Sequence, residues 1–140
     1  MNYLDKYKLW KEKVTDQELL DELNQLDEVS IEDAFYRDLA FGTGGLRGAL
    51  GVGTNRMNIY VVAKASQGLA NYINKHYTNP SIAIGYDTRI KSDVFSKVAA
   101  EVFSSKEWSV TINNGTTFIP GNWYSIHDNC LDINNWSKIK

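Results

Sequence analysis

The sequence has little of the chemistry on which many small proteins depend. Its single cysteine, Cys130, excludes an internal disulfide and fits a reducing compartment. The two histidines, His76 and His127, lie far apart, so a zinc site of the usual spacing is absent. The longest strongly apolar run covers only residues 59–63, whereas a membrane span needs about 20 residues. Because the first residues also lack the apolar segment of a secretory signal, we expect a cytoplasmic protein without a membrane partner.

The charge pattern excludes a further class of partner. A net charge of −2 gives no sign of nucleic-acid binding. The 140 residues are 43% apolar and 23% charged, which is ordinary for a globular protein with a core. The charge is unevenly spread, however, at −6 over residues 1–40 and +4 over residues 41–140. The mildly basic part suits a small anionic ligand, although its charge alone does not show one.

Residues 1–40 are predicted to form helices. Aromatic residues recur at helical spacing near the start, and Thr15 with Glu18 forms a capping-box pattern before a helix expected over about 16–27. Ser30 is expected to cap a third helix. We expect a helical arm packed on the body of the protein, with a partner-binding arm as the alternative.

The rest of the chain predicts alternating helices and strands. Their order is helix, strand, helix, strand, over about 58–76, 81–86, 93–105 and 108–112. Ser92 is expected to cap the second of these helices. This order implies a right-handed crossover that joins two parallel strands. After Pro120 no period of either 2 or 3.6 residues is evident.

A glycine-rich stretch over residues 41–53 is the main functional signal, with 6 glycines in 13 residues. Such density lets a backbone approach a ligand closely or turn through unusual angles. The spacing is that of neither a Walker loop nor a dinucleotide fingerprint, because Arg47 stands where a third glycine would be needed. Its guanidinium can hold a phosphate with two hydrogen bonds, and the Thr43 hydroxyl and glycine N–H groups can add donors. The alternative is a tight structural turn with a surface arginine.

A second signal, Gly85-Tyr-Asp-Thr-Arg89, follows the first predicted strand. Ligands of open α/β sheets bind beyond the carboxyl ends of the strands, which is where Asp87 and Arg89 are expected. Arg89 is a candidate second phosphate contact, and Asp87 either orients it or caps the next helix. The alternative is a local ion pair in a loop.

These signals belong to an ordered series of motifs. The series resembles the first domain of the α-D-phosphohexomutases over about residues 1–103, and in particular the long bacterial phosphoglucomutase/phosphomannomutase branch. The resemblance implies an acidic helical arm (1–40) followed by domain I (41–140), a three-layer α/β/α sandwich with a mixed sheet. The segments that carry it are Phe41-Gly-Thr-Gly-Gly-Leu-Arg-Gly48, Gly53-Thr-Asn-Arg-Met-Asn58, Gln67-Gly-Leu-Ala70 and Gly85-Tyr-Asp-Thr-Arg89.

The resemblance also implies a function. Family members interconvert hexose 1-phosphate and hexose 6-phosphate through a phosphoserine and a bisphosphate intermediate, with Mg²⁺ in the full-length enzyme. Arg47 matches the arginine that reaches the active-site phosphate, and Thr43, Gly44 and Gly45 match the loop that carries it. Arg89 matches a position beside the same cleft. The expected ligand is therefore a hexose phosphate.

The sequence departs from the family in its second half. The phosphoserine run Thr-Ala-Ser-His-Asn-Pro and the Asp-Gly-Asp-Gly-Asp metal loop are absent from these 140 residues. We therefore expect no catalytic or metal-binding residue, no cofactor in the chain itself, and little activity alone. The loss of resemblance after Phe103 suggests a truncated or frameshifted mutase, in which Trp108, Trp123 and Trp136 would be exposed. The alternatives are a weak phosphosugar-binding module and an interaction protein that self-associates through the face a second domain would cover.

Overall fold

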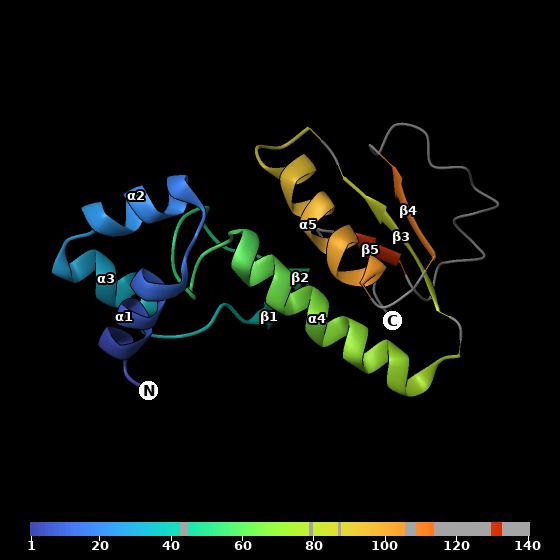
Figure 1. Ribbon diagram of the computed structural model, residues 1–140, viewed down its shortest axis with the longest axis horizontal. Coiled ribbons are helices and arrows are strands. Elements are labelled where there is room, and N and C mark those ends of the chain that lie inside the picture. The colour runs from blue at the N-terminus through green and yellow to red at the C-terminus, as the bar shows by residue number, and fades with distance from the viewer. Residues whose placement is uncertain (43–44, 79, 87, 106–108, 114–129, 133–140) are drawn as a thin grey trace.

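A computed structural model describes residues 1–42, 45–78, 80–86, 88–105, 109–113 and 130–132 (Figure 1). The first three helices gather at one end of the molecule, and the other two helices lie beside a small sheet. The helices are α1 (Tyr3–Lys13), α2 (Gln17–Gln25), α3 (Glu28–Phe35), α4 (Ile59–His76) and α5 (Ser92–Ser104). The strands are β1 (Phe41–Gly42), β2 (Gly45–Leu46), β3 (Ser81–Gly85), β4 (Ser109–Asn113) and β5 (Cys130–Asp132).

The helical prediction for residues 1–40 is confirmed, and these three helices surround a core of their own. Phe35 on α3 is fully buried at its centre. Two aromatic rings of α1 meet Phe35 edge-on, Tyr7 at 5.9 Å and Trp10 at 5.5 Å between ring centroids. Leu23 of α2 completes this core, so the aromatic residues at helical spacing are what hold the arm together.

The predicted caps of three helices are wrong. Asp16, not Thr15, caps α2 by accepting a hydrogen bond from the Leu19 amide at 3.0 Å. Asp27, not Ser30, caps α3, and the Ser30 amide is instead the donor to it at 2.7 Å. Ser92 is the buried first residue of α5. The residue before it, Lys91, takes the N-cap position and has a left-handed backbone conformation with φ 69°. A carboxylate next to the first turn satisfies its free amides directly, and this explains the shift at Asp16 and Asp27.

The body of the protein is built on a parallel three-stranded sheet with the order β4-β3-β5. The predicted pairing of the first two strands is confirmed, with Ser81 opposite Ser109 in a parallel register. Strand β5 was not predicted, and it pairs with the other edge of β3. The core between helices and sheet is apolar, and its members include Val62, Ile73, Ile82, Ile84, Phe95 and Phe103.

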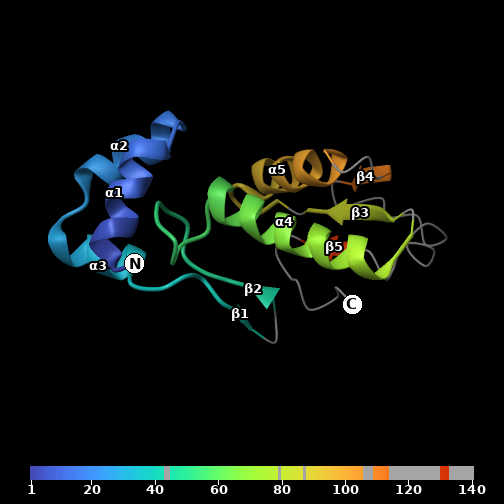
Figure 2. The ribbon, with the colours of Figure 1, turned by 60° about the horizontal axis from the view of Figure 1, so that its bottom comes forward.

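The expected three-layer α/β/α sandwich with a mixed sheet is wrong for the residues that the structure describes. Helices dominate these residues, and every pairing in the larger sheet is parallel. Helix α5 packs against α4 as well as against β3 and β4, so both helices form one layer (Figure 2). The antiparallel pair β1–β2 forms a separate two-stranded sheet rather than extending the larger one. The described segments after Ser105 are short strands, and they supply no helix for a second face.

Candidate functional site

The glycine-rich stretch begins with two short paired strands, β1 and β2, which form the arms of a hairpin. Phe41 pairs with Leu46 and Gly42 with Gly45 in an antiparallel register, so the turn spans only two residues. Leu46 is buried in the core that α4 and α5 share, and the next residue, Arg47, is exposed. A buried anchor thus directly precedes the predicted phosphate-binding arginine. Of the other predicted loop residues, Gly45 lies in β2, whereas Thr43 and Gly44 lie outside the described residues.

The next segment, residues 49–58, contains the end of the glycine-rich stretch and is held in place by Asn58. This side chain is only 3% exposed, and its amide nitrogen donates to the carbonyls of Gly51 and Gly53 at 2.8 and 2.9 Å. Its oxygen accepts from the amides of Tyr60 and Val61 at 3.1 and 3.0 Å, which caps α4. One buried asparagine therefore joins the loop to the start of the helix.

Residues 49–58 are also joined to the helical arm. The Asn55 side chain donates to the Asp33 carbonyl at 3.1 Å and accepts from Arg37 Nε at 3.1 Å. Arg56 forms an ion pair with Asp33. Gly53 adopts φ 128° directly against Ala34, where an added Cβ would lie 2.5 Å from the Ala34 carbonyl oxygen. Only glycine fits this contact between the loop and the arm.

Sequence reasoning quoted Asn55-Arg-Met-Asn58 as a family motif but gave it no role. The structure shows that its two asparagines fix the loop between the arm and α4. The signal was present in the sequence, because an asparagine directly before an apolar helical stretch is a common helix cap.

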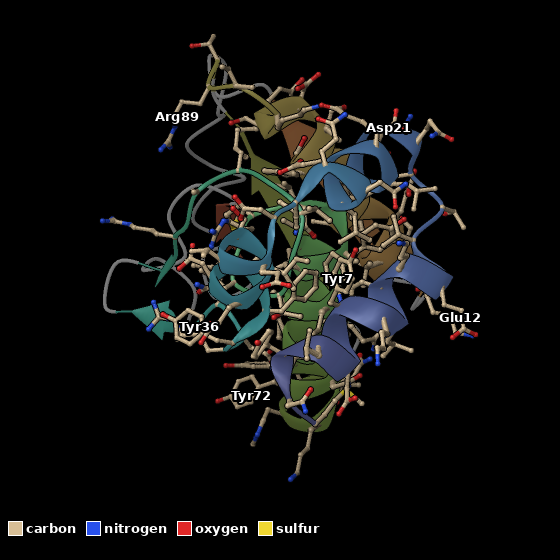
Figure 3. All side chains as sticks on the ribbon, turned by 90° about the vertical axis from the view of Figure 1, so that its left-hand side faces the viewer. Tyr7, Glu12, Asp21, Tyr36, Tyr72 and Arg89 are labelled. Atoms are coloured by element: carbon tan, nitrogen blue, oxygen red, sulfur yellow. The ribbon has the colours of Figure 1, made fainter. Side chains whose placement is uncertain are left out.

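Arg89 lies on a different element, the turn between β3 and α5, and is exposed. Figure 3 shows it at the edge of the molecule. Its predicted companion Asp87 lies outside the described residues. Arg47 and Arg89 thus reach the surface from separate elements, and their joint action on one phosphate stays a prediction.

Two kinds of site are absent from the described part of the chain. No group of three or more histidine, cysteine, aspartate or glutamate residues there is arranged to hold a metal ion. Within the same residues, no helix combines the length and apolar character needed to cross a membrane.

Residues 38–132 match the protein family described as phosphoglucomutase/phosphomannomutase, alpha/beta/alpha domain I. The chain belongs to this family. The match begins just before the hairpin. It includes Arg47, the segment Asn55-Arg-Met-Asn58 and all three strands of the parallel sheet. It also continues beyond Phe103, where the motifs alone had placed the end of the resemblance. The divergence on which the frameshift hypothesis rests is therefore smaller than the motifs suggested.

Curated relatives agree with this family. The chain is 36% identical to a phosphoglucomutase of Staphylococcus aureus strain RF122 over 102 residues, which is 73% of this chain and 18% of the relative. It is 41% identical to a phosphoglucomutase of Staphylococcus haemolyticus over 75 residues, which is 54% of this chain and 14% of that protein. The matched part is thus less than a fifth of either relative's length. No solved structure matches the chain.

Proposed function

We propose that this chain supplies the phosphate-binding loop of a phosphoglucomutase/phosphomannomutase. In such an enzyme, hexose 1-phosphate and hexose 6-phosphate are interconverted through a phosphoserine and a bisphosphate intermediate. The observation that carries the proposal is the exposed Arg47, one residue after the buried Leu46, within the segment that matches the family. A cytoplasmic location is part of the proposal, because the substrates are phosphorylated sugars.

The role of Arg47 follows from the chemistry of phosphoryl transfer. Catalysis of this reaction depends on positioning the phosphate and balancing its charge, and a guanidinium does both with two parallel hydrogen bonds. The backbone of Arg47 is restrained because the preceding residue, Leu46, is paired with Phe41 and has a buried side chain. The glycine N–H groups of the same hairpin are further donors to a phosphate. Arg89 is a second candidate contact from the turn before α5.

We further propose that the chain alone does not turn over substrate. Its 140 residues contain neither the phosphoserine run nor the aspartate-rich metal loop of the family. Mg²⁺ assists the full-length enzymes, and in this chain no ligand set for it is proposed. A single exposed arginine binds a phosphate weakly, because water and salt screen the charge. We expect millimolar binding of hexose phosphates.

Titration of the ¹⁵N-labelled chain with glucose 1-phosphate, followed by NMR, tests the binding proposal. We expect concentration-dependent shifts of the Gly45, Leu46 and Arg47 amides. Arg47→Gln should remove these shifts, and the matched variant Lys97→Gln, which changes an exposed lysine on α5, should keep them. Equal shifts in wild type and Arg47→Gln would contradict the proposed role. A mutase assay on the pure chain completes the test, and turnover above background would contradict the proposed inactivity.

A second candidate is self-association, which an exposed apolar surface favours. Leu50, Ile90 and Val94 line one depression beside the start of α5, with exposures of 48%, 78% and 37%. Large exposed apolar side chains in one place are typical of contact surfaces. Sedimentation equilibrium of the wild type and of Ile90→Ser tests this candidate. A monomeric wild type at all concentrations would exclude it.

A further inference from the structure

A second cavity lies beside the base of the hairpin, between the helical arm and α4. Its volume is about 560 Å³, which is within the range of pockets that hold small organic molecules. Aromatic and aliphatic side chains make up most of the wall, chiefly Trp10, Leu39, Leu46, Tyr60, Val61 and Leu69. The cavity therefore offers a mostly apolar interior built from two parts of the chain.

Gly68 in the wall indicates unused space. This glycine lies in the interior of α4, where glycine weakens a helix relative to alanine. An added Cβ at Gly68 would meet nothing within 4 Å, so packing inside the chain does not require the glycine. The missing side chain leaves room on the wall of the cavity.

The charged groups of the wall are Asp38 and Lys64, and Lys6 reaches Asp38 from outside the lining. Each oxygen of the Asp38 carboxylate faces one lysine, Lys6 Nζ at 3.3 Å and Lys64 Nζ at 3.0 Å. Two ammonium groups thus share one carboxylate, and a net positive charge remains. Lys64 is the accessible one, with 75% of its side chain exposed against 22% for Lys6. An ammonium carries three donors, so Lys64 can bind a second anion while it keeps Asp38.

We propose that this cavity binds an organic anion with an aromatic body. The ring enters among Trp10, Tyr60 and Leu39, and the anionic group meets Lys64. Trp10 and Tyr60 already meet edge-on at 5.6 Å between ring centroids, and offset or edge-on contact with a further ring is favourable. This site shares Leu46 with the hairpin but does not include Arg47 in its wall, so it does not depend on the proposed function.

Two probes of the same shape test both parts of the proposal. The anion is 2-naphthalenesulfonate and the neutral analogue is 2-naphthalenemethanol, each titrated into the ¹⁵N-labelled full chain. We expect both to shift the amides of Leu46, Ala65 and Gly68. The sulfonate should bind roughly 3–10-fold more tightly, as one exposed charge contact allows. Shifts confined to other residues would overturn the proposal.

Variants separate the shape of the cavity from its charge. Gly68→Leu fills the open space on the wall and should weaken both probes at least about tenfold, with helicity retained because leucine favours a helix. Lys64→Gln should weaken only the sulfonate. Lys75→Leu and Lys75→Gln are matched controls at an exposed site on the same helix and should bind like wild type.

The same variants state what would overturn the account. If folded Gly68→Leu binds both probes as tightly as wild type does, the probes do not bind in this cavity. If Lys64→Gln leaves the affinity for the sulfonate unchanged, Lys64 does not contact the anionic group. Arg47→Gln should bind the sulfonate as wild type does. A failure of the phosphate-loop proposal can therefore be told apart from a failure of the cavity proposal.

Discussion

Two neighbouring segments that share the glycine-rich stretch, residues 41–48 and residues 49–58, differ in how the protein uses them. In residues 49–58, two buried asparagines and Gly53 join the loop to the arm and to α4. In residues 41–48, strand β2 ends at the buried Leu46, and the exposed Arg47 follows it directly. Glycines that follow one another in a single motif therefore serve two purposes. Residues 49–58 fix the structure, and we propose that Arg47 of the first segment meets a ligand.

We expect the largest effect on stability from a change at Gly53, in the segment 49–58. Gly53→Ala places a Cβ 2.5 Å from the Ala34 carbonyl oxygen at φ 128°, so we expect a loss of about 2–4 kcal/mol in the free energy of unfolding. Urea denaturation followed by circular dichroism measures it. The matched change Gly68→Ala meets open space in a helix and should instead stabilise by about 0.5–1 kcal/mol. Equal effects of the two changes would contradict the distinction.

Asn58→Ala should have the next largest effect. It removes the cap of α4 and two donors to the carbonyls of Gly51 and Gly53, so we expect a loss of about 2–3 kcal/mol in unfolding free energy. Asn24→Ala, an exposed asparagine on α2, serves as the control and should change stability by less than about 0.5 kcal/mol. A loss no larger than that of the control would mean that Asn58 does not hold the loop.

Tyr60→Phe sharpens the comparison at the junction between arm and body. The Tyr60 hydroxyl accepts from the amides of Thr15 and Asp16, both at 3.0 Å. Its removal should cost about 1 kcal/mol of stability. Hydrogen exchange should show faster exchange of these two amides, and the proposed binding of phosphate at Arg47 should not change. Unchanged exchange at both amides would show that the junction does not depend on this hydroxyl.

We expect the smallest effect from Asp38, on the loss of stability at acid pH. The hydrogen bond from Lys64, helped by Lys6, holds the pKa of the Asp38 carboxyl below its usual value of 3.8. A lowered pKa stabilises the folded protein above the unfolded pKa, and this contribution is lost as pH falls through the folded pKa. Because the pair is exposed, we expect only a few tenths of a kcal/mol. Stability of the wild type should therefore fall slightly more than that of Asp38→Asn between pH 5 and 3 in the same denaturation assay.

The sequence predicts the long elements well. Helix α4 and the parallel pair β3–β4 follow from apolar spacing, and the family match supports the motifs that contain Arg47. Long periodic segments carry enough apolar positions to define both their type and their buried face.

The rest depends on tertiary contacts that no local pattern carries. Cys130–Asp132 forms a strand of only three residues, which is too short to show a period. Thr15 begins a capping-box pattern, yet its amide donates to the hydroxyl of Tyr60, 45 residues away. The roles of Asn55 and Gly53 require knowing that Asp33 and Ala34 lie against the loop.

The central claim is that Arg47 is present for a ligand and not for the fold. The most direct test measures both properties of Arg47→Gln, its unfolding free energy and its dissociation constant for glucose 1-phosphate. The account predicts stability within about 0.5 kcal/mol of wild type and a loss of the wild-type binding. Unchanged binding, or a loss of stability comparable to that of Asn58→Ala, would contradict it.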